Sequence, residues 1–174
     1  TLAERSGAED LIFIYLTSHG SLSHELVLDQ PRLALADLPA AELAELLAPL
    51  RERDKVVVIS ACYSGGFLPG LKDERTLVIT AARADRVSFG CSEENDFTYF
   101  GKAFFGQALN ETDDLERAFQ RARELIAERE RSDGFEPSEP QIWAPQGVLQ
   151  RWRQLRENQA REAMGTLAAG KPRP

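Results

Sequence analysis

The chain has 174 residues and a mass of 19.4 kDa, which is the length of one ordinary domain and enough to bury a sizeable apolar core. Its 28 acidic and 21 basic residues give a formal net charge of −7, which argues against nucleic acid as the main partner. Two cysteines are too few for a disulfide scaffold, and the apolar runs are too short to span a membrane, so we expect no membrane contact by this chain.

The first residues do not contain a basic segment followed by an apolar run, so the sequence as given carries no export signal. Thr1 is not a natural start, and removal of an upstream signal or anchor is compatible with the sequence. The compartment is therefore unknown, with the cytoplasm and the periplasm both open.

Three short apolar runs predict strands, at residues 11–16, 55–60 and 76–80. The runs do not alternate with polar residues, which is typical of strands covered on both faces of a parallel sheet. Between the first two runs, residues 38–50 carry leucines at helical spacing, so strand, helix and strand form one right-handed crossover unit. The predicted fold class is α/β.

After the third strand we expect an irregular polar stretch at residues 83–96 and an aromatic-rich helix at residues 97–109. A longer amphipathic helix at residues 113–131 follows. The domain then ends with a loop at residues 132–140 and a short edge strand at residues 141–143. We expect the aromatic rings of the first helix to lie in the core. From Val148 onward the chain reads as a surface helix that frays. We therefore expect a domain over residues 1–147 and a C-terminal helix with a flexible tail over residues 148–174.

Two residues suited to thiol chemistry follow two of the predicted strands. His19 and Gly20 follow the first strand, and Cys62 follows the second. The carboxyl ends of neighbouring parallel strands meet at one edge of a sheet, so we expect His19 and Cys62 to lie near each other. A histidine beside a cysteine generates the nucleophilic thiolate, and backbone N–H groups beside glycines can bind an oxyanion.

Plainer readings of these residues exist. A cysteine at a strand end is often only a small buried hydrophobe, and a histidine near a turn is ordinary. A zinc site formed by His24, His19 and Cys62 is disfavoured, because no acid or second thiol is nearby, so we expect no metal. A nucleotide-binding domain is disfavoured too, because no glycine-rich phosphate loop follows the first strand.

The chain resembles the caspase-like cysteine peptidases, in which one apolar strand ends in His-Gly and another in Ala-Cys. Within them it looks most like the legumain (asparaginyl endopeptidase) family. The segment from Thr80 to Cys91, followed by Thr98-Tyr-Phe-Gly101, looks like the legumain stretch that precedes and contains the substrate-pocket serine. Pro140-Gln141 fits the end of that domain, so the resemblance covers about Leu11 to Trp143.

This resemblance implies a three-layer α/β/α fold with a mostly parallel sheet. It implies a cysteine endopeptidase acting on peptides or proteins through a thioester acyl-enzyme. Cys62 would be the nucleophile, His19 the general acid/base, and the backbone N–H groups of Gly20 and Cys62 the oxyanion hole. Ser88 would line the primary specificity pocket. No metal or organic cofactor is implied.

The sequence departs from legumain in the pocket. Legumain has an acid two residues before the nucleophile, where this chain has Ser60, and another after the Tyr-x-Gly segment, where this chain has Lys102. Strand alternation puts Ser60 on the same side as Cys62, so we expect Ser60 to face the pocket and bind substrate. The resemblance implies that Lys102 binds substrate there as well. These departures leave the residue before the scissile bond open, with an acidic or small residue as an alternative to asparagine.

The sequence also departs from the family ahead of His19, which only 18 residues precede. The family's first strands would supply an asparagine near the histidine and an arginine to the pocket. We therefore expect a fragment, a processed product or a reduced relative, with a separate N-terminal segment of the same protein as a candidate partner.

Two other functions stay open on the sequence. A transamidase or ligase would use the same dyad and pass the acyl group to an amine. A non-catalytic caspase-like domain would serve binding or regulation. Cys91 is expected to be a free thiol. Residues 93–96 are expected to form a solvated loop or, with Asn95 or Asp96 as the site, a self-cleavage loop.

Overall fold

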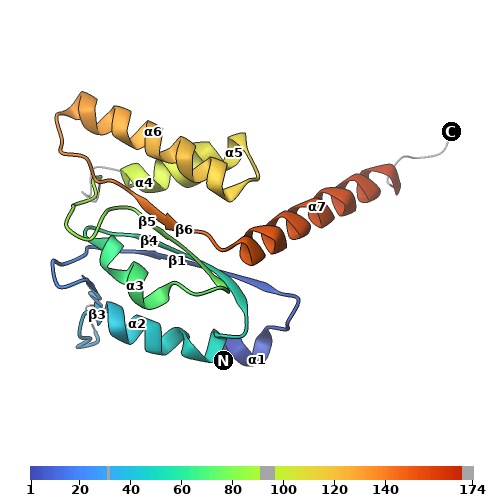
Figure 1. The fold of residues 1–174 in the computed structure, drawn as a ribbon, viewed down its shortest axis with the longest axis horizontal. Helices are drawn as coiled ribbons and strands as arrows, with labels where there is room; N and C mark the ends of the chain where they lie inside the picture. Colours follow the sequence, from blue (N-terminus) through green and yellow to red (C-terminus); the bar gives the residue numbers. More distant parts are fainter. Residues whose placement is uncertain (31, 91–96, 170–174) are drawn as a thin grey trace.

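A computed structural model describes residues 1–30, 32–90 and 97–169 of the chain. A four-stranded sheet forms the central layer, in the order β1-β4-β5-β6. Figure 1 shows α2 and α3 on one face of the sheet and α4, α5 and α6 on the other. The architecture is a three-layer α/β/α fold with a mostly parallel sheet, as the sequence predicted.

The elements run in chain order as follows: α1 (Leu2–Arg5), β1 (Leu11–Thr17), β2 (Glu25–Leu26), β3 (Leu38–Pro39), α2 (Ala40–Leu47), a 3₁₀ turn (Ala48–Leu50), β4 (Asp54–Ser60), a second 3₁₀ turn (Ser64–Phe67), α3 (Leu68–Leu71), β5 (Thr76–Thr80), α4 (Tyr99–Gly101), a π-helix (Lys102–Ala108), α5 (Leu109–Glu111), α6 (Leu115–Asp133), β6 (Gln141–Trp143) and α7 (Gln146–Ala169).

The three predicted apolar strands pair in parallel, β4 with β1 on one side and with β5 on the other. The predicted edge strand β6 runs antiparallel to β5. Every residue of β5 is buried, and so are all residues of β4 after Asp54. The prediction that every strand is covered on both faces is wrong for β1. Among the described strands β1 lies at the edge of the sheet, and its Phe13 and Tyr15 are 38% and 40% exposed.

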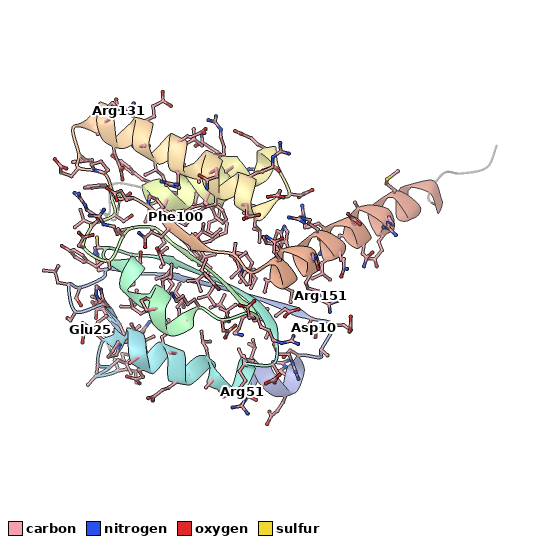
Figure 2. All side chains as sticks on the ribbon, in the orientation of Figure 1. Asp10, Glu25, Arg51, Phe100, Arg131 and Arg151 are labelled. Carbon is pink, nitrogen blue, oxygen red and sulfur yellow. The ribbon has the colours of Figure 1, made fainter. Side chains whose placement is uncertain are left out.

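Side-chain alternation along β4 divides the core into two clusters. Val56 and Val58 point toward a cluster that includes Phe100 and Phe104. Val57 and Ile59 point to the opposite face and pack against residues of α2 and α3. Figure 2 shows Phe100 between the sheet and α6, where it is almost completely buried. This packing fixes the sheet between its two helical layers and holds the strand ends in place.

Two predicted helices differ in detail from the structure. Leu38–Pro39 pairs with Glu25–Leu26, so α2 begins only at Ala40. The aromatic-rich helix consists of α4, the π-helix and α5 rather than one regular helix. The core prediction is wrong for Phe97, which is 67% exposed, because Phe97 precedes the helix and its first apolar turn.

Helix α7 starts in the core and ends outside it. Val148 and Leu149 are buried in its first turns, and the helix then extends away from the domain (Figure 1). Arg151 forms ion pairs with Glu9 and Asp54, so α7 contacts the segment before β1 and the first residue of β4. Of the helices that the structure describes, none has the length and apolarity needed to cross a membrane.

Candidate active site

The register of β1 and β4 brings His19 and Cys62 to the same edge of the sheet. Thr17 lies opposite Ser60 in the parallel ladder, and the Ser18 N–H donates to the Ser60 carbonyl at 3.3 Å. His19 and Cys62 each follow two residues after that last pair. The main chain at His19 is also held in place, because its carbonyl accepts a hydrogen bond from the Val27 N–H at 3.0 Å.

Gly20 lies directly against the backbone of Cys62. A Cβ atom at position 20 would be 2.1 Å from the Cys62 carbonyl oxygen and 3.2 Å from the Ala61 Cβ. Only glycine lets two main chains approach this closely. The β1 and β4 ends therefore meet backbone to backbone at Gly20 and Cys62.

The Cys62 thiol contacts the main chain of Ser88. The Ser88 N–H donates to Cys62 Sγ at 3.3 Å, and Sγ also lies 3.3 Å from the Ser88 carbonyl oxygen. Among the described residues, no hydrogen bond joins the His19 ring to Cys62 Sγ. Cys62 is half-buried, whereas His19 is exposed. The site thus holds a partly accessible sulfur next to a main-chain donor, with an exposed imidazole on the adjoining strand end.

The turn after Cys62 is supported by His24. Tyr63 has a left-handed backbone with φ of 56°, and its N–H donates to the Arg86 carbonyl at 2.7 Å. His24 Nδ1 lies 3.2 Å from the Tyr63 carbonyl oxygen, so the Nδ1–H tautomer donates to it. A Cβ atom at Gly66 would lie 2.1 Å from the His24 ring. His24 therefore packs under the turn that follows Cys62, a role that the sequence pattern alone did not indicate.

The predicted pocket residues take three different positions. Ser60 is buried, and its hydroxyl pairs with the Thr98 hydroxyl at 3.2 Å. Thr98 caps α4 by accepting from the Gly101 N–H at 2.9 Å. Ser88 is buried and reaches Cys62 through its main chain, and Lys102 lies exposed at the start of the π-helix. The structure thus links Ser60 to the start of α4 and places Lys102 at the surface of the same layer.

The loop between α6 and β6 holds the segment that carries Ser88. The Arg83 N–H donates to the Ser138 carbonyl at 2.9 Å, and the Arg83 guanidinium pairs with Asp85 and Glu139. The hydrogen bond from Arg83 lowers the pKa of the exposed Asp85 carboxyl to about 2. The sequence predicted a loop at residues 132–140 but not its contacts, because composition indicates a loop without indicating what the loop touches.

The buried carboxyl of Glu130 also holds the loop between α6 and β6 in place. Both oxygens of Glu130, on α6, accept from the Ser138 N–H at 3.2 Å. Burial raises the pKa of Glu130, and the hydrogen bond from Ser138 opposes that rise. Glu139, which follows Ser138, has a positive φ of 54°, a backbone conformation that costs free energy for a residue other than glycine.

The described residues contain no group of three or more histidine, cysteine, aspartate or glutamate side chains that could hold a metal ion. In the zinc combination that the sequence disfavoured, His19, His24 and Cys62, the His24 Nδ1 lies against the Tyr63 carbonyl oxygen instead. Cys91 and residues 93–96 lie outside the described residues.

A model of the Peptidase C13 family matches residues 3–151. Among solved structures, the crystal structure of caspase-1 from Spodoptera frugiperda is similar, with a TM-score of 0.54 and 15% sequence identity. The similarity covers 78% of this chain and 60% of the caspase chain, so the chain spans less than two thirds of that protein's length. No curated protein matches the chain. Because the family match spans most of its length, the chain belongs to the Peptidase C13 family, the legumain family of cysteine peptidases, and has their caspase-like fold.

Proposed function

We propose that this chain is a cysteine endopeptidase in which Cys62 attacks the peptide carbonyl and His19 is the general acid/base. The observation that carries the proposal is the backbone contact between Gly20 and Cys62, which joins the two strand ends. That contact supports a site in which the imidazole and the thiol share one edge of the sheet. Rotation of the exposed His19 side chain on substrate binding would bring its ring to the sulfur.

In this mechanism the Cys62 thiol gives its proton to His19, and its sulfur forms a thioester with the acyl part of the substrate as the peptide C–N bond breaks. The leaving amine takes a proton from His19, and a water molecule that gives its proton to His19 then hydrolyses the thioester. The N–H groups of Gly20 and Cys62 would stabilise the negative oxygen of each tetrahedral intermediate. The close approach of the two main chains supports this role, because both N–H groups belong to the same pair of strand ends.

The test is labelling of the purified chain with a thiol-directed peptidyl electrophile, followed by mass mapping. We expect fast modification at Cys62, and a drop of about 100-fold or more in His19→Ala, the size of a lost general base. Cys91 provides an internal comparison, since we expect it to react at the rate of an ordinary thiol. Equal and slow labelling of both cysteines in the unaltered chain would contradict the proposal and favour a binding or regulatory domain.

Hydrolysis and acyl transfer to an amine share the first half of this mechanism. Product analysis with and without an added amine nucleophile separates them, because a transamidase gives the amide product at the expense of the free acid. Water reaches an open thioester readily, and the exposure of His19 favours hydrolysis.

We also propose that β1 pairs with a strand from a separate N-terminal segment of the same protein. Among the described strands, β1 pairs only with β4, and its aromatic residues Phe13 and Tyr15 are partly exposed. A long apolar edge strand of this kind is a template for strand addition. Hydrogen exchange tests the idea, since the β1 amides should exchange more slowly when that segment is present. Equal exchange rates would contradict it.

A further inference from the structure

An open cavity of about 740 Å³ lies on the sheet face that carries α4 and the π-helix. Aromatic side chains of Tyr15, Phe97 and Phe105 line it, together with the longer polar side chains of Lys102 and Gln107. The Tyr15 and Phe105 rings meet edge to face, with their centroids 4.8 Å apart. The lining is therefore mostly apolar, with a single cationic group.

This cavity adjoins the candidate active site through a short series of contacts. Gly101 lines the cavity, and its N–H is bound by the Thr98 hydroxyl, which pairs with Ser60 two residues before Cys62. On the other side, Tyr15 belongs to the strand that leads to His19. Residues that line the cavity thus connect to both strand ends, and a peptide whose carbonyl is at Cys62 would extend toward it.

Lys102 is the only charged residue that lines the cavity within the part of the chain that the structure describes. Its ammonium has no ion pair with any described acid, whereas Arg129, which lines a smaller pocket together with Lys102, pairs with Asp133. An unpaired ammonium at the edge of an aromatic cavity attracts a carboxylate and repels a cation. The same aromatic walls would contact the methylene groups of the bound side chain.

We propose that this cavity receives a substrate side chain and that Lys102 selects an acidic one, aspartate or glutamate. The proposal rests on the proposed function, because it places the bound peptide with its adjoining carbonyl at Cys62. Closing the cavity with a peptide removes water from around the ammonium, which strengthens its attraction for a carboxylate. Lys102 is then a specificity-determining residue rather than a member of the catalytic pair.

The experiment uses three peptidyl electrophiles that differ only in the residue next to the reactive group, which is aspartate, asparagine or lysine. The rate of Cys62 modification is measured by mass mapping for each probe, and each rate is divided by that of iodoacetamide on the same protein. We expect the aspartate probe to exceed the asparagine probe by about fivefold, the size of one partly exposed ion pair. The lysine probe should react most slowly.

Three variants make the result specific to Lys102. Lys102→Met keeps the length of the side chain without its charge and should bring the aspartate and asparagine rates together. Lys102→Glu should favour the lysine probe. Lys72→Met removes the same charge at the end of α3, where the ammonium lies over the Trp143 ring, and should leave the preference unchanged.

An aspartate preference that persists in Lys102→Met, or an asparagine preference in the unaltered chain, would overturn the proposal. Failure of the proposed function looks different. In that case His19→Ala leaves every rate unchanged, while the ratio between probes still reports whether Lys102 selects the side chain. A selective attraction by Lys102 should also weaken as salt rises, because the ammonium is exposed.

Discussion

The rings of Phe89 and Phe135 stack with their centroids 4.4 Å apart and their planes within 4° of parallel. Phe89 belongs to the segment whose Ser88 contacts the Cys62 thiol, and Phe135 belongs to the loop after α6. The Phe89 carbonyl in turn accepts from the Tyr99 N–H at 3.0 Å, at the start of α4. The stack and this hydrogen bond therefore join three separate parts of the chain around Cys62.

Phe135→Ala should loosen this segment without unfolding the domain. Loss of an aromatic pair costs about 1 kcal/mol, which should speed amide exchange in residues 83–90 by about fivefold through local opening. Hydrogen exchange measured by mass spectrometry checks this, with the buried amides of β4 and β5 as the internal reference. Leu46→Ala, an exposed apolar truncation on α2, is the control. Equal exchange in the two variants would contradict the role of the stack.

Gly20→Ala should destroy the candidate site by separating the two strand ends. The new Cβ would meet the Cys62 carbonyl oxygen at 2.1 Å, so the backbone has to move. We expect a stability loss of about 1–3 kcal/mol from overpacking, and a loss of about 100-fold or more in Cys62 labelling by a peptidyl electrophile, the size of a lost catalytic group. Denaturant unfolding and labelling rates measure the two effects.

The matched control for that substitution is Gly147→Ala. The nearest atom to a Cβ at position 147 is 4.0 Å away, so the methyl group fits without displacement. Its stability should stay within about 0.5 kcal/mol of the unaltered chain or rise slightly, because alanine favours a helix. A similar loss of labelling in both variants would show that the Gly20 contact has no particular role.

Gly66→Ala and His24→Gly should be strongly coupled. A methyl group at position 66 would overlap the His24 ring, so Gly66→Ala alone should cost about 1–3 kcal/mol. His24→Gly removes the ring and suits the positive φ of 60° at that position. Gly66→Ala should therefore cost much less in the His24→Gly background, which a double-mutant cycle of unfolding free energies measures. Simple additivity would contradict the packing of His24 under the Cys62 turn.

The raised pKa of Glu130 predicts a pH dependence of stability. Because the folded-state pKa lies above the ordinary value of 4.5, the folded state binds more protons than the unfolded state in that range. The stabilisation from the protonated group is present below the ordinary value and is lost as pH rises through the folded-state pKa. Glu130→Gln keeps an acceptor for the Ser138 N–H and has no charge to desolvate, so its advantage over the unaltered chain should grow with pH.

Urea unfolding at a series of pH values from about 4 to about 8 measures this difference. Glu128→Gln, on the exposed side of the same helix, controls for the loss of a carboxyl group from α6. A free-energy difference between Glu130→Gln and the unaltered chain that stays constant across the series would contradict the prediction.

Much of the fold followed from the sequence, because continuous apolar runs indicate buried strands whatever surrounds them. The strands around Val57 and Val78, the crossover helix and the edge strand at Ile142 were all predicted, and the family resemblance is confirmed. The places of His19 and Cys62 also followed, since each stands directly after an apolar strand. Their catalytic roles stay predictions.

Contacts between distant segments could not be predicted in the same way. The pairing of Arg83 with Glu139, the stack of Phe89 on Phe135 and the packing of His24 under the Tyr63 turn join residues that have no shared periodicity. Phe97 shows the same limit, because an aromatic residue near a helix start is buried or exposed according to what the rest of the fold places beside it.

The sequence by itself determined the α/β class, the order of the strands along the chain and the residues that follow them, because hydrophobic periodicity and strand-end position are local properties. Only the tertiary structure decided that Gly20 touches the Cys62 carbonyl, that Ser88 meets the thiol through its main chain, and that Lys102 borders an aromatic cavity. These contacts depend on strand register, strand order and loop packing. Such features are set only when distant parts of the chain bury their apolar surface against one another.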